Sequence, residues 1–208
     1  MGHGNPVALT KLQPQSSLGI DCHSVCSSYI PTQMMLSLQW QRARRHEDFE
    51  RQGKWAKTVG YSVADVYNLG TIQGARGIGM EKEIGSLEVG KKADIAIFDC
   101  QTPGMAVAAD RDPVAAIVLH STVRDVVMVI IDGVLRKKSG VVEPVDVVGD
   151  ISSSELKEQV QWEDIAHRVI KMGQEIDQKK KTAVDGKVAE EAILKGFHLN
   201  VDSWSDQV

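Results

Sequence analysis

The chain has 208 residues, of which 42% are apolar and 25% charged, and its formal net charge is −4. This composition is typical of a globular protein and argues against a disordered, collagen-like or membrane-spanning chain. The mildly acidic balance and the lack of a long apolar run give no indication of a nucleic-acid or membrane partner. Three cysteines, with no recognisable export signal, favour reduced thiols and a cytoplasmic location.

The first elements in chain order are a short strand and a long helix. Residues Ser16–Asp21 form an apolar segment that ends in an acid, which predicts one buried strand. Apolar side chains gather between Ile30 and Trp40, and charged ones continue to Arg51, which predicts a helix buried at its start and solvated at its end. The basic run at 42–46 is followed at once by acids, so a solvated helix face is favoured over a nucleic-acid site.

A second helix is predicted from a capping signal. Ser62 followed by Asp65 is the pattern in which a hydroxyl and a carboxylate each satisfy a free backbone N–H at a helix start. Apolar side chains keep a helical spacing beyond it, and glycines then lower the helix propensity. We expect this helix to end near Gly77 or Gly79.

The middle of the chain changes to a strand pattern. Turn residues followed by an apolar run at 85–99 predict a turn that leads into a buried strand. Further apolar runs occupy 114–119 and 125–131, and Asp132-Gly133 after the last of these predicts a hairpin. From Ser152 the spacing is helical again as far as Lys181, and a shorter helix is expected over 187–195.

Asp21 is the residue with the clearest catalytic potential. A carboxylate at the end of a buried strand occupies the position at which a (βα)8 barrel presents its catalytic groups. By itself this pattern is more typical of a turn or helix-capping aspartate than of a catalytic one. Cys22 and Cys26 flank His23, but a structural zinc site requires about four nitrogen or sulfur ligands, so ordinary thiols are favoured.

Four segments, in this order, resemble the C-terminal part of the amidohydrolase superfamily, in its cytosine deaminase and chlorohydrolase-like branch. The most specific is G-S-L-E-V-G-K-K-A-D, and the fuller form around Asp21 is most similar to fungal members. The four segments are Leu18–Asp21, Ala64–Met80, Gly85–Asp99 and Arg124–Leu135.

The resemblance implies an α/β fold, namely the C-terminal remnant of a metal-dependent hydrolase (βα)8 barrel with a small β-sandwich and a helical tail. It implies that Asp21 ends the eighth barrel strand, contacts one divalent metal (zinc or iron) and relays a proton from the attacking water. Such enzymes hydrolyse C–N or C–Cl bonds of small molecules. His23 is the candidate substrate contact, and Cys22 and Ser24 are its neighbours near the same pocket.

The resemblance also implies that the chain has three segments and that it lacks the barrel strands that carry the family's histidine ligands. Residues 1–82 would hold the last strand and flanking helices of an incomplete barrel, 83–145 the β-sandwich segment and 146–208 a helical extension. The family's histidine ligands lie upstream of the eighth strand, and only His3 precedes Asp21 here. We therefore expect the isolated polypeptide to be inactive, because a catalytic metal needs about three protein ligands.

Three hypotheses follow for function. The chain is part of a hydrolase that acts on a small molecule, or a non-catalytic interaction module, or one half of a split enzyme. The second and third predict a partner, either a further copy of the chain in a homo-oligomer or a complementing chain. None of the three predicts binding to nucleic acid or to a membrane.

Overall fold

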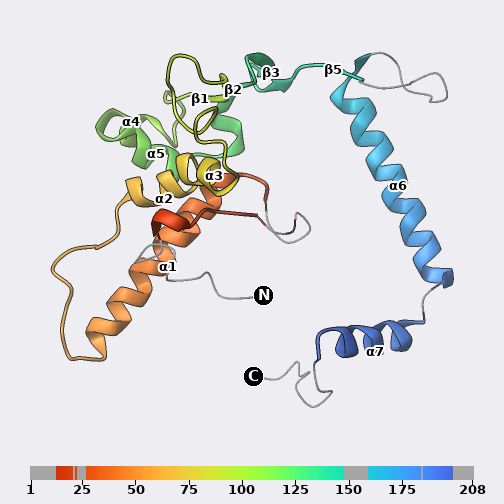
Figure 1. Cartoon of the computed structure of the whole chain (residues 1–208), viewed down its shortest axis with the longest axis horizontal. Coiled ribbons are helices and arrows are strands. Elements are labelled where there is room, and N and C mark those ends of the chain that lie inside the picture. The colour runs from red at the N-terminus through yellow and green to blue at the C-terminus, as the bar shows by residue number, and fades with distance from the viewer. Residues whose placement is uncertain (1–12, 21, 23–26, 148–158, 184, 199–208) are drawn as a thin grey trace. The chain divides into compact units, whose positions relative to one another are not determined.

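A computed structural model describes residues 13–20, 22, 27–147, 159–183 and 185–198. The chain divides into two compact units, Met1–Glu143 and Pro144–Val208, each of which is described by itself (Figure 1). Both helices and strands are present, so the described chain is mixed α/β.

The helices of the first unit confirm several predictions. The long helix and the capped helix both form, and Ser62 and Asp65 make the reciprocal capping box. The amide N–H of Ser62 donates to Asp65 Oδ2 over 2.8 Å, and that of Asp65 to Ser62 Oγ over 3.3 Å. The helices of this unit are α1 (Ile30–Glu50), α2 (Val63–Leu69), α3 (Ile72–Gly77), α4 (Ala106–Arg111) and α5 (Pro113–Leu119), with 3-10 turns at Gln13–Gln15 and Val123–Asp125.

The core of this unit lies where α1, α2 and α5 pack together, as Figure 1 shows. Leu38, Val66 and Leu69 are fully buried there. Burial of such side chains is the main source of stability, at about 1.5–3 kcal/mol for each one. The cluster consists of Met34, Leu38, Val66, Leu69 and Val118.

The prediction of one helix from Ser62 to Gly77 or Gly79 was wrong in its middle. The helix stops at Gly70, and α3 begins after Thr71 and ends at Gly77. A Cβ atom at Gly70 would lie 2.2 Å from Met34 Cε, so the missing side chain allows the close approach of α1. The hydroxyl of Thr71 donates to the carbonyl of Tyr67 over 2.8 Å and satisfies the end of α2.

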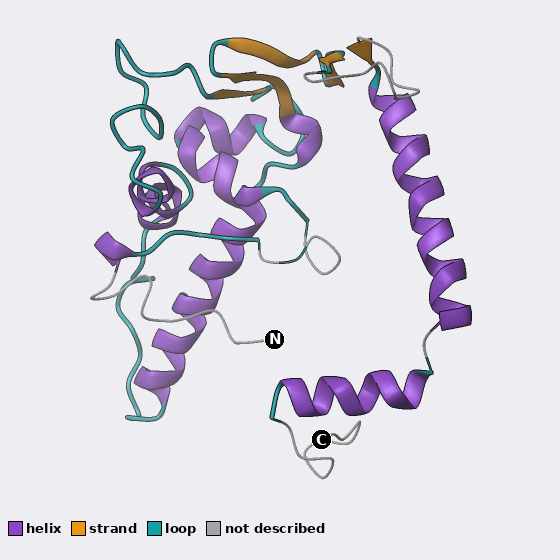
Figure 2. Ribbon diagram, turned by 45° about the vertical axis from the view of Figure 1, so that its right-hand side comes forward, coloured by secondary structure: helices purple, strands orange, loops and turns teal. Residues whose placement is uncertain are grey.

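A four-stranded antiparallel sheet with the order β1-β2-β3-β4 completes the unit. Asp132 and Gly133 have φ values of 51° and 75° and join β2 to β3, which confirms the predicted hairpin. In Figure 2 the orange strands lie next to one another, beside the purple helices of the same unit. The strands are β1 (Ile95–Phe98), β2 (Val126–Ile131), β3 (Val134–Lys138) and β4 (Val141–Val142).

Two predicted strands are not strands in the structure. The apolar run at 114–119 forms α5, because Asp112 caps its N-terminus by accepting from the Ala115 amide over 2.9 Å and Pro113 occupies the first turn. Ser16–Ile20 have no regular secondary structure, and the Leu18 amide donates to the Leu69 carbonyl of α2 over 3.3 Å.

The basic run of α1 lies among acceptors of its own unit. Arg42 donates to the carbonyl of Tyr61 over 2.9 Å, and Arg45 donates to that of Thr58 over 2.6 Å. Arg44 and Arg51 both pair with Glu47, at 3.6 Å and 3.5 Å. The arginines of the basic run therefore all have hydrogen-bond or ion-pair partners within their own unit.

Within its described residues, the second unit has two helices and one short pair of strands, β5 (Val145–Asp146) and β6 (Gln159–Val160). Its helices are α6 (Trp162–Ala183) and α7 (Gly186–Gly196), and both were predicted, although α6 begins after β6 rather than near Ser152. The residues 152–158 of that prediction lie outside the described ones. Among the described helices, none is both long and apolar enough to cross a bilayer.

Candidate functional site

The residues predicted to carry chemistry cluster around position 21. Asp21 and His23 lie outside the described residues, so their roles stay predictions. The segment that leads to them is placed: Leu18 is half-buried against the helical core, and Cys22 is exposed. The backbone just before Asp21 is thus attached to α2 through Leu69.

The segment G-S-L-E-V-G-K-K-A-D, residues 85–94, folds around the ammonium group of Lys91 and is called the clasp below. Lys91 Nζ donates to the carbonyl of Glu81 over 2.6 Å and to Ser86 Oγ over 2.5 Å, and lies 3.2 Å from Glu88 Oε1. Only 10% of the Lys91 side chain is exposed. The Ser86 hydroxyl, which donates to Glu88 Oε1, and then Lys91 lower the pKa of Glu88. These contacts hold the turn of the segment.

Both ends of the clasp are anchored to neighbouring elements. Gly85 has a φ of 86°, and its Cα packs so closely on α3 that an added Cβ would lie 2.7 Å from Ala75 Cβ. At the other end, Asp94 Oδ1 accepts from the Asp132 amide over 2.7 Å, which fixes the hairpin turn. The segment therefore joins α3 to the sheet.

Asp125 is a buried carboxylate that the sequence interpretation missed. It is 6% exposed and accepts from the Thr122 amide over 2.6 Å, the Thr122 hydroxyl over 2.9 Å and the Thr102 hydroxyl over 2.7 Å. Thr122 followed by Asp125 is the same capping pattern as Ser62 followed by Asp65, so a signal was present in the sequence. These donors are all neutral groups of the fold.

The pKa of Asp125 reflects opposing effects. Burial acts to raise it, but the hydrogen bonds from Thr102 and Thr122 together outweigh burial and leave the pKa lowered. Tyr29 nearby donates its hydroxyl to Ser121, and its own pKa is raised, mainly by burial. The charge on Asp125 adds to this increase.

We expect Asp125→Asn to lower the free energy of unfolding by about 1–3 kcal/mol near neutral pH, because an amide N–H would then face the donors of Thr122. A lowered folded-state pKa stabilises the fold above the unfolded value of 3.8, and this contribution is lost as the pH falls through the folded-state pKa. Urea unfolding of both proteins at about pH 7 and about pH 3 should show the difference shrinking. The prediction would be contradicted if the loss were equal at both pH values, or if Asp110→Asn on the surface lowered the free energy of unfolding as much as Asp125→Asn.

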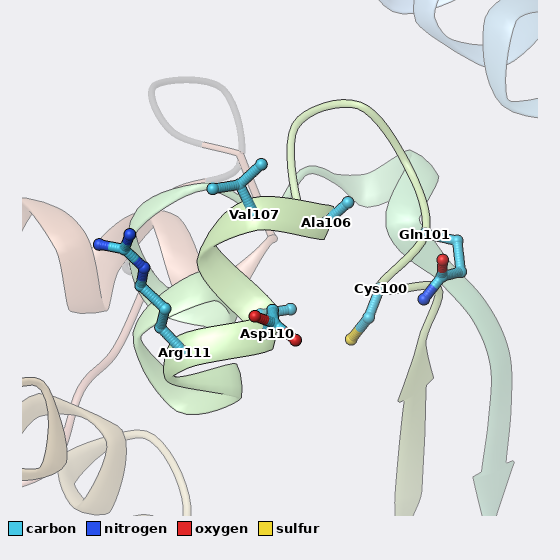
Figure 3. Close-up of a pocket in the computed structure, with 7 residues that line it drawn as sticks. Cys100, Gln101, Ala106, Val107, Asp110 and Arg111 are labelled. Carbon is cyan, nitrogen blue, oxygen red and sulfur yellow. The ribbon is translucent and has the colours of Figure 1, made fainter.

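A hollow of about 530 Å³ lies between the turn after β1 and helix α4. Cys100 and Gln101 line it from the turn, and Asp110 and Arg111 from the helix (Figure 3). The hollow is open to solvent and holds one half-buried thiol. Among the described residues, no three His, Cys, Asp or Glu side chains are grouped closely enough to hold a metal ion.

The chain matches the family model described as "Amidohydrolase family" over residues 11–136, well over half of its length. It therefore belongs to the amidohydrolase family. The match begins before Asp21 and ends within the hairpin, so it includes the clasp and the Asp125 site.

Two curated relatives and one solved structure illustrate the similarity. A 5-methylthioadenosine/S-adenosylhomocysteine deaminase of Symbiobacterium thermophilum is 44% identical over 73 residues, which are 35% of this chain and 16% of the relative. A 5'-deoxyadenosine deaminase of Methanobrevibacter smithii is 54% identical over 37 residues, 18% of this chain and 8% of the relative. A zinc-bound adenosine deaminase structure from Xanthomonas campestris is 19% identical with a TM-score of 0.43, and the match covers 58% of this chain and 24% of that one. The chain thus spans less than a fifth of the length of the curated relatives named here.

Proposed function

We propose that the chain is the C-terminal part of an amidohydrolase that hydrolyses a C–N bond and releases ammonia from the adenine ring of a nucleoside altered at its 5′ position. The observation that carries the proposal is the 44% identity to a 5-methylthioadenosine/S-adenosylhomocysteine deaminase. The similarity to a 5'-deoxyadenosine deaminase agrees with it, since both names describe adenosines changed at the same carbon. The resemblance to the cytosine deaminase and chlorohydrolase-like branch, and within it to fungal members, remains a prediction.

In this proposal Asp21 accepts a proton from the water that attacks the ring carbon and delivers it to the leaving amine, and His23 contacts the substrate. A carboxylate can make both transfers because it takes up a proton as the carboxylate and gives it back as the carboxylic acid. The family implies a divalent metal, zinc or iron, for the complete enzyme. Among the described residues no three possible ligands are grouped closely enough to hold this metal, and Asp21, which lies outside them, is proposed to contact it in the complete enzyme. The proposal also includes the family fold, in which Asp21 ends a barrel strand and residues 83–145 form part of a β-sandwich.

The first test is the genomic and transcript sequence that precedes the codon for Met1. We expect an open reading frame that continues in frame upstream and encodes a strand followed by His-x-His. A stop codon or unrelated sequence at that place would rule out this proposal for the gene product.

The second test is an activity measurement on the longest product of that reading frame. We expect ammonia release from 5'-methylthioadenosine and S-adenosylhomocysteine, and a decrease of kcat by at least about a hundredfold in Asp21→Asn. Asp110→Asn, which changes an exposed acid at the hollow instead, is the matched control and should keep full activity. Undiminished turnover in Asp21→Asn would contradict the assigned proton relay.

The interaction-module alternative is favoured by one observation, the apolar side of α6. Several large apolar side chains of this helix are exposed in the structure. They have no part in the proposed chemistry.

A further inference from the structure

Helix α6 carries an apolar stripe with the spacing of a coiled coil. Its members follow one another in steps of three, four, three and four residues, which are the a and d positions of two heptads and the first position of a third. Positions a hold Trp and two β-branched residues, and positions d hold Ile and Met. The stripe consists of Trp162, Ile165, Val169, Met172 and Ile176.

Most of this stripe is exposed although it is apolar, and Ile165 is its half-buried member. Val169 is 62% exposed, Met172 60% and Ile176 54%. Most helices in proteins gain their stability by burying an apolar face against a neighbour rather than from helix propensity. The stripe therefore has the properties of a contact surface.

The charges of α6 indicate which occupant fits. Its first turn is acidic, with Glu163 and Asp164, and its last turn is basic, with Lys180 and Lys181. A second copy running in the opposite direction brings each acidic end against a basic end. A parallel copy would instead gather the lysines of both chains at one end, where like charges repel.

The residues on either side of the stripe also favour an antiparallel pair. When Val169 lies opposite the partner's Met172 in an antiparallel pair, Arg168 faces the partner's Glu175, and this pairing occurs twice by symmetry. The small side chains of Ala166 and Gly173 occupy the other flank and leave room for close approach. Acidic and basic groups are mixed on the polar face, which is unlike the basic face of membrane-binding helices.

We propose that α6 is a homodimerisation helix, which pairs antiparallel with α6 of a second copy along Trp162–Ile176. The pairing goes beyond the proposed deaminase chemistry and does not depend on it. It gives the C-terminal unit a function of its own, the joining of two chains.

The test is sedimentation velocity of the 208-residue chain over about two decades of concentration, with the dimer expected to dominate at the upper end. Val169→Glu, at the centre of the stripe, should weaken dimerisation at least about tenfold, since burial of a valine is replaced by a charge in both copies. Ile170→Glu is the matched control: the native side chain is adjacent and 58% exposed, but it lies off the stripe, so the dimer should persist. Circular dichroism checks that both variants keep their helices.

A charge exchange tests the orientation. Arg168→Glu should weaken the dimer, and the addition of Glu175→Arg should restore it, because the two positions face each other only in the antiparallel pair. In a parallel pair the double variant would set arginine against the partner's Lys180 and would not restore it. A chain that stays monomeric, or a dimer that tolerates Val169→Glu, would overturn the proposal. Failure of the double variant to restore the dimer would overturn the antiparallel orientation.

Discussion

Replacement of Gly85 by alanine is expected to lower the free energy of unfolding by about 2–5 kcal/mol, combining the cost of a left-handed backbone with that of overpacking. The φ of Gly85 is 86°, a value that side chains of L-residues rarely adopt. The new Cβ would also lie 2.7 Å from Ala75 Cβ and 3.1 Å from the backbone Cα of Ile72. Backbone atoms cannot move aside as the end of a flexible side chain can, so α3 and the clasp would be pushed apart.

Gly90→Ala separates the two contributions. Gly90 has a φ of 95°, but nothing lies within 4 Å of its added Cβ, so only the backbone effect of about 1–2 kcal/mol is expected. Urea unfolding followed by tryptophan fluorescence gives both values. A second substitution, Ala75→Gly, should restore part of the loss in Gly85→Ala because it removes one of the clashing atoms. Equal losses at the two glycines, without restoration, would show that the clasp does not press on α3.

Leu38→Ala is expected to have an effect of similar size. Leu38 is 0% exposed and lies at the centre of the cluster formed by α1, α2 and α5. Truncation of a buried leucine leaves a cavity and lowers the free energy of unfolding by about 2–5 kcal/mol. The same urea experiment measures it.

Leu36→Ala is the control on the same helix. Leu36 is 53% exposed, so the identical change of residue type should alter stability by less than about 0.5 kcal/mol. Both substitutions have the same effect on helix propensity, and their difference therefore reports burial alone. A small and equal effect of the two would place the core elsewhere than between these helices.

Sequence patterns that depend only on residues adjacent in sequence predicted the fold well. The capping box of α2, the hairpin at Asp132-Gly133 and the long α1 depend on neighbours in sequence, and all three are confirmed. The break at Gly70 was missed because it depends on Met34, which lies on another helix. Residues 114–119 were wrongly predicted as a strand because a short apolar run has no period of its own, and the decisive signal was the Asp112-Pro113 start.

The candidate site was harder to predict from the sequence than the fold was. The interest in Asp21 came from its place at the end of an apolar segment and from family resemblance, and the residue lies outside the described part of the chain. Asp125 was overlooked although Thr122 and Asp125 form a recognisable cap, because its burial depends on Thr102 far away in sequence. The roles of family residues could be predicted by analogy, whereas the contacts that bury a carboxylate could not.

The clasp around Lys91 bears on how ancestry and activity are related in this family. Its serine, glutamate, lysine and glycine positions are occupied with holding a turn between α3 and the sheet. These contacts hold the turn whether or not the chain turns over a substrate. Detection of this signature in a genome therefore identifies descent of the scaffold, and the search for catalysts among such descendants has to begin from other positions.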